Sequence, residues 1–198
     1  MLNNFFKGTA GWLAKTGSIK EAYIEVYAVA MQAALAMILN LITTMLVGGI
    51  LHMFRHSIVL LAAFIPLRSY AGGYHARGYL SCYVESSLLL AAVLIFLKQV
   101  FQKPVLGMVI GSLFAVAVIM IILWAPMADA NKPLSPKETI VFRRRTCILL
   151  AAEVGLAVCL TVCKVPYGYT VMIAVILCAL LLGIHKGQLF WRQRRNKQ

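Results

Sequence analysis

The sequence is poor in charge, and above all in acidic charge. Only 13% of the 198 residues are charged, and six of these are acidic against 19 basic. A soluble globular domain carries about 25% charged residues, so this chain lacks the polar side chains that would cover a water-soluble fold. Disorder is excluded for the opposite reason, because 62% of the residues are hydrophobic. The composition indicates an integral membrane protein with a single domain over residues 1–198.

Several familiar signatures are also missing. There is no phosphate-binding loop and no dinucleotide-binding fingerprint, which argues against powered transport and redox function. The five cysteines are an odd number, so they do not indicate a disulfide framework. The pairs Cys159 with Cys163 and His52 with His56 each lie four residues apart, but apolar packing and interfacial polar roles are favoured over zinc. We therefore predict no metal and no cofactor.

Apolar runs separated by short polar segments predict an all-α polytopic membrane bundle. The runs cover residues 26–51, 57–67, 79–97, 105–124, 146–163 and 167–184. At least four of these six are long enough to cross a hydrocarbon core of about 30 Å. The first is interrupted by polar residues, so one of its faces is expected to pack on protein; these are Gln32, Asn40, Thr43 and Thr44.

Two segments at the start of the chain are harder to assign. The run 57–67 is shorter than the about 17–25 residues that a spanning helix needs, so we expect a half-helix or a re-entrant piece that stops near Pro66. Residues 2–17 combine aromatic side chains with lysines. That composition predicts an interfacial helix, with a loosely ordered tail as the alternative.

The basic residues predict the orientation of the chain. If both termini and segments 68–77 and 125–145 face the cytoplasm, the inner side holds fifteen Lys and Arg and the outer side four. The positive-inside rule favours this arrangement. The charges are spread over short loops, so membrane lipids are the expected partner of these basic residues, and nucleic acid is not.

One stretch between the apolar runs differs from the rest of the chain. Residues 68–82 are dense in glycine and polar side chains, and they contain His75 and Cys82 seven positions apart. An imidazole serves as base for a thiol nucleophile only within hydrogen-bond reach. A continuous helix would separate the two by about 10.5 Å, so the chain must bend between them, which Gly78 makes sterically cheap. Taken alone, this spacing is a weak signal, and a structural loop with an incidental cysteine is the simpler interpretation.

The bend would place Cys82 in the first turn of the third apolar helix. A helix N-terminus favours the thiolate form of a cysteine, and Arg68 or Arg77 would act in the same direction. Ser81 and Glu85 lie close in sequence. Glu85 is either a group that orients His75 or a solvated charge, and no catalytic triad is predicted.

The pattern Arg68-x4-Gly73-x-His75-x6-Cys82, in a basic membrane protein of this length, resembles the accessory gene regulator B family. The run Asn131-Lys132-Pro133 in the basic middle loop matches as well. The resemblance implies a cysteine endopeptidase of the bacterial cytoplasmic membrane, with its active site toward the cytoplasm. Such an enzyme cuts the C-terminal part off a short quorum-sensing propeptide through an acyl-enzyme thioester and promotes closure of a thiolactone or lactone ring.

The resemblance also assigns roles to residues. It implies that Cys82 is the nucleophile and His75 the general base, with Arg68 and Gly73 in support, and that the protein forms a homodimer. In this family the C-terminal part of the propeptide is acidic, so basic residues of the chain are candidates for recruiting it. These candidates are Lys132, Arg143, Arg144 and Arg145, for which a role as topology anchors is the favoured alternative.

Glu153 lies near the middle of the fifth run, where an ionisable group is costly. It either contacts the bound peptide or a dimer partner, or it is a protonated group bonded to a neighbouring helix. A second function class stays open as well, namely a small transporter or scaffold without enzymatic activity. That class predicts tolerance of substitution at Cys82 and dependence on Glu153 or Gln32.

Overall fold

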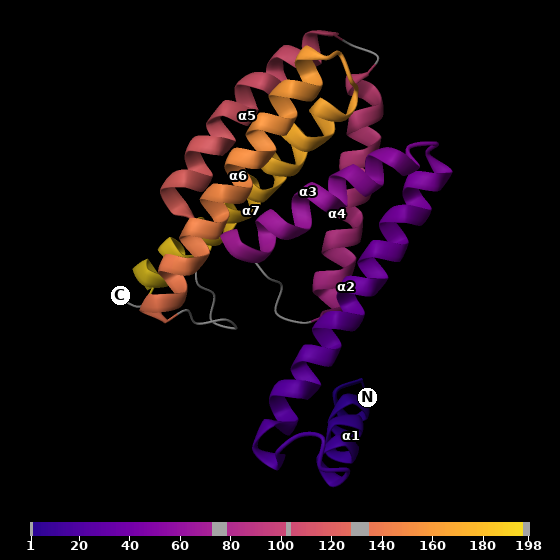
Figure 1. Ribbon diagram of the computed structural model, residues 1–198, viewed down its shortest axis with the longest axis vertical. Helices are drawn as coiled ribbons and strands as arrows, with labels where there is room; N and C mark the ends of the chain where they lie inside the picture. The colour runs from indigo at the N-terminus through magenta and orange to yellow at the C-terminus, as the bar shows by residue number, and fades with distance from the viewer. Residues whose placement is uncertain (1, 73–78, 102–103, 128–134, 196–198) are drawn as a thin grey trace. The chain divides into compact units, whose positions relative to one another are not determined.

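A computed structural model of the chain consists almost entirely of helices (Figure 1). It describes residues 2–72, 79–101, 104–127 and 135–195. No strand occurs within these ranges. Their α-helices are α1 (Leu2–Lys15), α2 (Ile24–Ile50), α3 (Phe54–Ala71), α4 (Tyr79–Val100), α5 (Pro104–Trp124), α6 (Pro136–Val162) and α7 (Tyr167–Arg195), with a 3-10 turn over Glu21–Tyr23. The predicted all-helical fold is confirmed.

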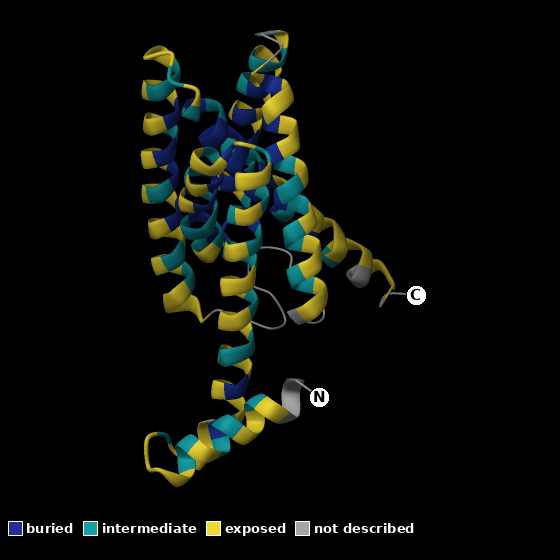
Figure 2. Ribbon diagram, turned by 90° about the vertical axis from the view of Figure 1, so that its right-hand side faces the viewer, coloured by how far each residue is buried: buried dark blue, intermediate teal, exposed yellow. Residues whose placement is uncertain are grey.

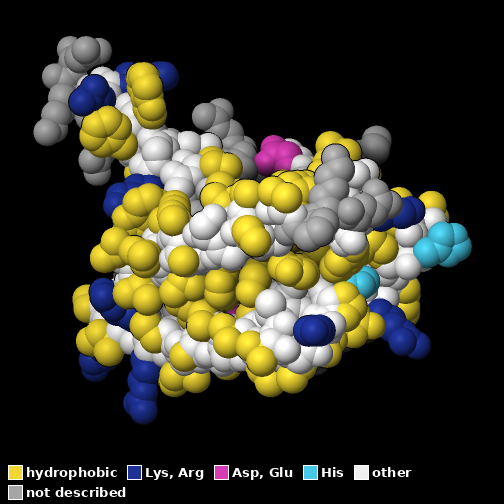
Figure 3. All heavy atoms as spheres, turned by 90° about the horizontal axis from the view of Figure 1, so that it is seen from above, with side chains coloured by type: hydrophobic (Ala, Val, Ile, Leu, Met, Phe, Trp, Pro, Cys, Tyr) yellow, Lys and Arg dark blue, Asp and Glu magenta, His cyan; other side chains and the backbone are white. Residues whose placement is uncertain are grey.

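Five of these helices are long and apolar enough to cross a membrane: α2, α4, α5, α6 and α7. Figure 3 shows hydrophobic side chains over much of the face that it views. The prediction of at least four spanning segments is therefore confirmed. The helices form two compact units, of which unit 1 comprises residues 1–44 and 76–90, and unit 2 residues 45–75 and 91–198. The single-domain assignment stays a prediction.

In unit 1, α1 packs on the start of α2. Ala10 and Ala28 are almost fully buried, and the ammonium of Lys7 lies 2.9 Å from the carboxylate of Glu25. The aromatic side chains of Phe5 and Trp12 are exposed. The predicted helix near the N-terminus is confirmed, and its contact with the membrane surface stays a prediction.

The polar residues of α2 in unit 1 bond to the first turns of α4. The hydroxyls of Thr43 and Tyr83 share a hydrogen bond of 2.9 Å, and the hydroxyl of Ser87 donates to Asn40 Oδ1 at 2.9 Å. Because these groups lie on an apolar helix, pairing them with protein avoids the cost of leaving them unsatisfied in lipid. The expectation that this face of α2 packs on protein is confirmed.

In unit 2, α7 is the central helix. In its spanning part 61% of the residues are buried, whereas the other four spans have 11–22%. It packs against α3, α5 and α6, and Figure 2 shows the buried residues gathered between these helices. Its buried positions form a nearly continuous apolar run from Val171 to Leu182. An all-round apolar helix of this kind is suited to the middle of a bundle.

Helix α3 corrects one prediction. It does not stop near Pro66 but continues to Ala71, with Pro66 inside the helix. A proline removes only its own N–H donor and disturbs the carbonyl one turn before it, and such a defect is tolerated where neighbouring helices and hydroxyl groups surround it.

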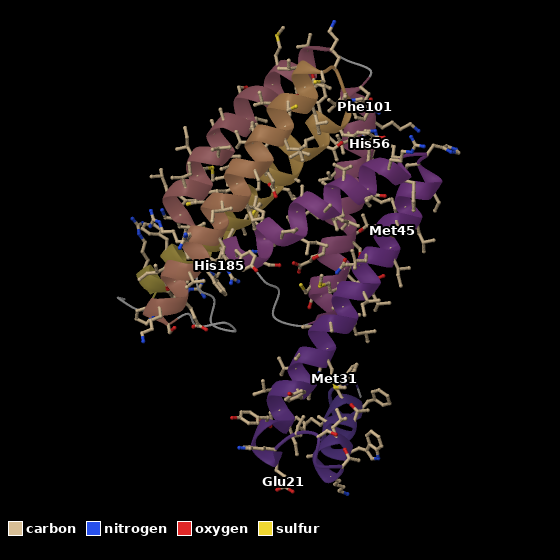
Figure 4. The ribbon with its side chains drawn as sticks, viewed as in Figure 1. Glu21, Met31, Met45, His56, Phe101 and His185 are labelled. Carbon is tan, nitrogen blue, oxygen red and sulfur yellow. The ribbon has the colours of Figure 1, made fainter. Side chains whose placement is uncertain are left out.

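The 18 residues of α3 give it a length of about 27 Å, and it runs from one end of unit 2 to the other. At its start, His56 contacts Phe101, which follows α4, and Tyr167, which begins α7. At its end, the carbonyl of Ala71 accepts a hydrogen bond from the N–H of Met127, just after α5. Figure 4 shows His56 and Phe101 near one end of the unit and His185 near the other. The stop near Pro66 is therefore wrong, whereas the half-helix or re-entrant assignment stays a prediction, since α3 is not among the five helices long and apolar enough to cross a membrane.

Two helices also extend beyond their predicted bounds. Helix α6 begins at Pro136, ten residues before the predicted run, because Ser135 and Glu138 form a reciprocal capping box. The N–H of Ser135 donates to Glu138 Oε2 at 2.9 Å, and the N–H of Glu138 donates to Ser135 Oγ at 3.3 Å. Helix α7 continues to Arg195, so most of the basic tail is helical.

The turns at the His56 end of unit 2 each contain a residue with left-handed backbone. His52 has φ 57° between α2 and α3, and Lys164 has φ 58° between α6 and α7. In both turns a backbone bond spans five residues, from Met53 N–H to Gly48 O at 2.7 Å and from Val165 N–H to Leu160 O at 2.8 Å. This is the helix-ending motif that usually contains glycine. The second of these turns joins α6 directly to α7.

Replacing His52 by Gly is expected to stabilise the protein by about 0.5–1 kcal/mol, since a side chain with left-handed backbone costs roughly 1–2 kcal/mol, which the greater freedom of unfolded glycine partly offsets. Thermal unfolding of the purified protein in detergent measures this. His52→Val is the opposite control, and a melting temperature that falls for both variants would contradict the interpretation.

His56 lies outside the five membrane-spanning helices. Its Nδ1 shares a 2.9 Å hydrogen bond with Thr170 Oγ1, and its ring lies 4.8 Å from that of Tyr167 and 4.9 Å from that of Phe101. Burial lowers the pKa of His56 below its usual 6.5, because removal from water disfavours the charged ring. The neutral ring therefore packs best between α3, α4 and α7.

The folded state therefore binds fewer protons than the unfolded chain at pH values just below 6.5. His56 should leave stability unchanged above this pH and lower it as the pH falls through that window. We expect the melting temperature to drop less between pH 7.5 and 5.5 in His56→Gln than in the wild type. The comparison of the two proteins cancels the contributions of the other histidines, and equal drops would disprove the assignment.

Candidate active site

The candidate site contains the predicted nucleophile, Cys82. It lies in the first turn of α4, in unit 1, as a free and half-buried thiol. Its position in the first turn is confirmed. Ser81 and Glu85 are exposed beside it. The bonds of Tyr83 and Ser87 to α2 fix the rotation of α4 and thereby the direction in which its first turn presents Cys82.

Five residues with a predicted role lie outside the described parts of the chain. These are the predicted base His75, with Gly73, Arg77 and Gly78 around it, and Lys132 of the middle loop. The residues that flank these segments are described, and they show how the segments are attached to unit 2.

A backbone contact joins the end of α3 to the residue after α5. Gly72 and Met127 form an isolated parallel bridge, in which the N–H of Met127 donates to the carbonyl of Ala71 at 3.0 Å. Arg68 Nη1 donates to the carbonyl of Gly72, and the N–H of Gly72 donates to the carbonyl of Arg68 at 3.2 Å. Arg68 thus closes the last turn of α3 with both its side chain and its backbone.

No residue other than glycine fits at position 72. Its φ is +76° with ψ −152°, a region that only glycine adopts readily. A Cβ there would overlap the carbonyl of Met127. In sequence, His75 follows Gly72 by three residues and Lys132 follows Met127 by five. The bridge therefore fixes in one place the starting points of the segments that carry the predicted base and a predicted basic contact.

Tyr70 connects α3 to the start of α6. Its ring packs edge to face on Phe142 with centroids 5.6 Å apart, and its hydroxyl accepts a hydrogen bond of 3.2 Å from Arg145. The Arg145 guanidinium also lies 5.3 Å from the centre of the Tyr70 ring. Arg143 and Arg144 are exposed on the same helix. The three neighbouring arginines, all predicted as one group, thus differ in their surroundings.

The two ends of unit 2 differ in charge. The end with Gly72 and Arg145 also holds Lys186, whose ammonium lies 4.1 Å from the Trp124 ring, together with Arg194 and Arg195 of α7. The end with His56 holds Arg55, Lys98 and Lys164. The predicted grouping of segments 68–77 and 125–145 and the tail at one end agrees with this arrangement.

Glu153 is buried in α6, as predicted, with 8% of its surface exposed. It shares its helix face with Thr146, Leu150 and Ala157. Within the described residues neither Glu153 Oε2 nor the hydroxyl of Thr146 has a hydrogen-bond partner. Of the two predicted roles, bonding of Oε2 to a neighbouring helix is therefore not seen in the described part of the chain. The described residues also hold no cluster of three potential metal ligands.

Comparison with known proteins decides the family. A family model for accessory gene regulator B matches residues 7–184. The chain belongs to this family. It is 28% identical over 141 residues to accessory gene regulator protein B of Staphylococcus carnosus, which covers 70% of the chain and 71% of that relative. It is 24% identical over 139 residues to AgrB-like protein 1 of Clostridium perfringens, covering 70% and 73%. No solved structure matches the chain.

The resemblance drawn from residues 68–82 is thus confirmed. Together with the five membrane-spanning helices, it makes the chain a multi-pass membrane protein of the accessory gene regulator quorum-sensing system.

The contacts of Gly72 predict that its replacement by alanine destabilises the protein. Gly72→Ala should lower the free energy of unfolding by about 2 kcal/mol or more, because it combines a forbidden backbone region with an overlap against Met127. Gly111→Ala in α5 is the matched control, since no atom within 4 Å would meet its Cβ. Thermal unfolding in detergent should show a loss for Gly72→Ala only; equal behaviour of the two variants would contradict the described bridge.

Proposed function

We propose that this protein is a membrane-embedded cysteine endopeptidase. In this proposal it removes the C-terminal part of a short quorum-sensing propeptide and promotes closure of a thiolactone or lactone ring. The observation that carries the proposal is a free, half-buried Cys82 in the first turn of an apolar helix, in a chain of the accessory gene regulator B family. Cys82 follows Arg68, Gly73 and His75 in the sequence, at the spacing typical of that family's pattern given above.

The chemistry requires two steps. His75 takes the proton of the Cys82 thiol, and the thiolate attacks the scissile carbonyl; the peptide bond breaks, the leaving amine receives the proton, and an acyl thioester remains on Cys82. A thiol or hydroxyl of the propeptide then attacks this thioester, forms the ring and returns the Cys82 thiol. Exchange of one thioester for another is close to neutral in free energy, so it competes with hydrolysis only where water is scarce and the attacking thiol is held near.

The surroundings of α3 support a role for Arg68 in placing His75. Arg68 bonds to the carbonyl of Gly72, and Gly72 is bound to Met127. Three residues of fully extended chain reach at most about 10–11 Å, so the anchored Gly72 limits where the imidazole of His75 can lie. In this proposal Arg68 is a positioning residue, and Gly73 provides the freedom for the chain to turn toward Cys82. Ser81 and Glu85 have no assigned step.

The exposed arginines of α6 support recruitment of an acidic segment. Arg143 and Arg144 are exposed in the first half of α6, and the net charge of +13 attracts acidic peptides over several ångströms. Arg145 differs because Tyr70 binds its guanidinium. We assign recruitment to Arg143, Arg144 and Lys132, and a structural role to Arg145.

The charge difference between the ends of unit 2 supports an orientation. The basic end, with Arg68, Arg145 and Lys186, would face the cytoplasm of a bacterial cell, in line with the positive-inside rule. The active site would then lie at the boundary between cytosol and membrane. We further propose a homodimer, since one chain of six short apolar segments encloses little space for a peptide.

Alkylation by iodoacetamide tests the catalytic pair without a known substrate. In the full-length protein, Cys82 should react at least about tenfold faster than an ordinary thiol, because a base-activated cysteine spends more time as thiolate. His75→Ala should remove most of this advantage, while His52→Ala should leave it unchanged. The rate at each cysteine is read by mass spectrometry, with the exposed Cys147 as the internal reference. If the alkylation rate of Cys82 were the same in the wild type and in His75→Ala, the proposed pairing of His75 with Cys82 would be disproved.

A non-enzymatic transporter is the second candidate, and the buried Glu153 favours it. Its Oε2, which has no hydrogen-bond partner among the described residues, is the kind of group that contacts a transported ligand. This candidate predicts that Cys82→Ala keeps full function and that Glu153→Gln abolishes it. The peptidase predicts loss of function with Cys82→Ala.

A further inference from the structure

A pocket of about 330 Å³ lies at the end of unit 2 opposite to the Gly72–Met127 bridge. Its walls come from the end of α4, the start of α5 and the turn between α6 and α7. The described lining residues are Val100, Phe101, Gly107, Thr161, Lys164, Val165, Pro166 and Tyr169. The proposed catalytic residues take no part in it, so the pocket needs a separate explanation.

Gly107 creates part of the space for the Tyr169 side chain. A Cβ on Gly107 would lie 2.7 Å from the Tyr169 hydroxyl, so only glycine lets the ring lie across α5 at this level. The hydroxyl of Thr161 is already used, since it donates to the carbonyl of Ala157 at 2.7 Å. The Tyr169 hydroxyl makes no hydrogen bond within the described residues, which leaves it available to a ligand.

Lys164 provides the charge. It is the one charged residue among the described lining residues, and no acidic group within the described parts of the chain pairs with it. Its left-handed backbone places it at the apex of the turn, where its N–H donates to the carbonyl of Thr161 at 3.0 Å. The pocket therefore combines apolar walls with an ammonium and a hydroxyl that has no partner in the described part of the chain, a set of groups suited to an anion attached to an apolar body.

The position of the pocket along the spanning helices indicates which kind of anion it binds. Helix α4 ends at Val100, α5 begins at Pro104, α6 ends at Val162 and α7 begins at Tyr167, so the pocket lies where spanning helices leave the hydrocarbon core. Beside it in sequence, Val105, Met108 and Val162 are 72%, 82% and 75% exposed. Such exposed apolar side chains at the ends of spans are suited to acyl chains, and the headgroup layer begins at the same depth.

We infer that this pocket binds the phosphate of an anionic phospholipid headgroup, with Lys164 and Tyr169 as the contacts. The acyl chains would lie along the exposed residues of α5 and α6. A lone net positive charge in the described lining favours a headgroup with net negative charge over a zwitterionic one. The inference does not rest on the peptidase activity, so either can fail without the other.

The test uses the purified full-length protein in detergent. Short-chain phosphatidylglycerol, short-chain phosphatidylcholine and inorganic phosphate are added in parallel, and bound lipid is counted by native mass spectrometry alongside the melting temperature. We expect phosphatidylglycerol to bind at least about fivefold more tightly than phosphatidylcholine, a difference of about 1 kcal/mol, and inorganic phosphate to have no effect.

Variants assign the binding to the pocket. Lys164→Gln and Tyr169→Phe should each weaken phosphatidylglycerol binding at least about threefold, while their melting temperatures without lipid stay near that of the wild type. Lys98→Gln is the matched control, because Lys98 is an exposed lysine at the same end but does not line the pocket. The inference is overturned if Lys98→Gln has the same effect as Lys164→Gln, if both lipids bind equally, or if inorganic phosphate competes as well as the lipid.

Discussion

The need to pair backbone polar groups inside the membrane determines how this protein is built. A chain with 13% charged residues has few groups to place in water, and in a hydrocarbon core every N–H and carbonyl must bond within the protein. Long helices satisfy that need, and α7 lies at the centre of unit 2 because it is apolar on all sides. Chemistry that requires polar side chains and a bent backbone is thereby confined to the ends of the helices. The bridge of Gly72 with Met127 and the pocket at Lys164 both lie at such ends.

The local features of the sequence predicted most of the fold. Apolar runs predicted the spanning helices, and the polar positions Asn40 and Thr43 predicted the face of α2 that bonds to α4. The bend required between His75 and Cys82, together with the apolar run that begins at residue 79, placed Cys82 in the first turn of its helix. The start of α6 was missed although the sequence contains a signal for it, since Ser135 and Glu138 have the spacing of a capping box.

Other features depend on contacts between distant residues, and no local pattern predicts them. Pro66 indicated the end of a helix, but packing against α6 and α7 allows α3 to continue. The pairing of Arg145 with Tyr70 spans 75 positions of sequence, so nothing distinguished Arg145 from Arg143 and Arg144. The contact between Gly72 and Met127 is of the same kind. The sequence showed only that Gly72 belongs to a glycine-rich bend.

The two ends of unit 2 suit different partners. One end holds the backbone bridge and most of the described arginines and lysines, and the other holds an apolar pocket whose described lining contains one lysine. We propose an acidic peptide segment as the partner of the first end and a lipid headgroup as the partner of the second. In these proposals lipid stabilises the far ends of α4, α5 and α7.

The most direct test of the proposed chemistry is detection of the acyl-enzyme. The purified protein would be incubated with a synthetic propeptide that has an acidic C-terminal part, and its intact mass measured before and after hydroxylamine, which cleaves thioesters. We expect a hydroxylamine-sensitive adduct on Cys82, with release of the C-terminal fragment, that is absent in Cys82→Ala. Fragment release by Cys82→Ala, or an adduct on another cysteine, would contradict it.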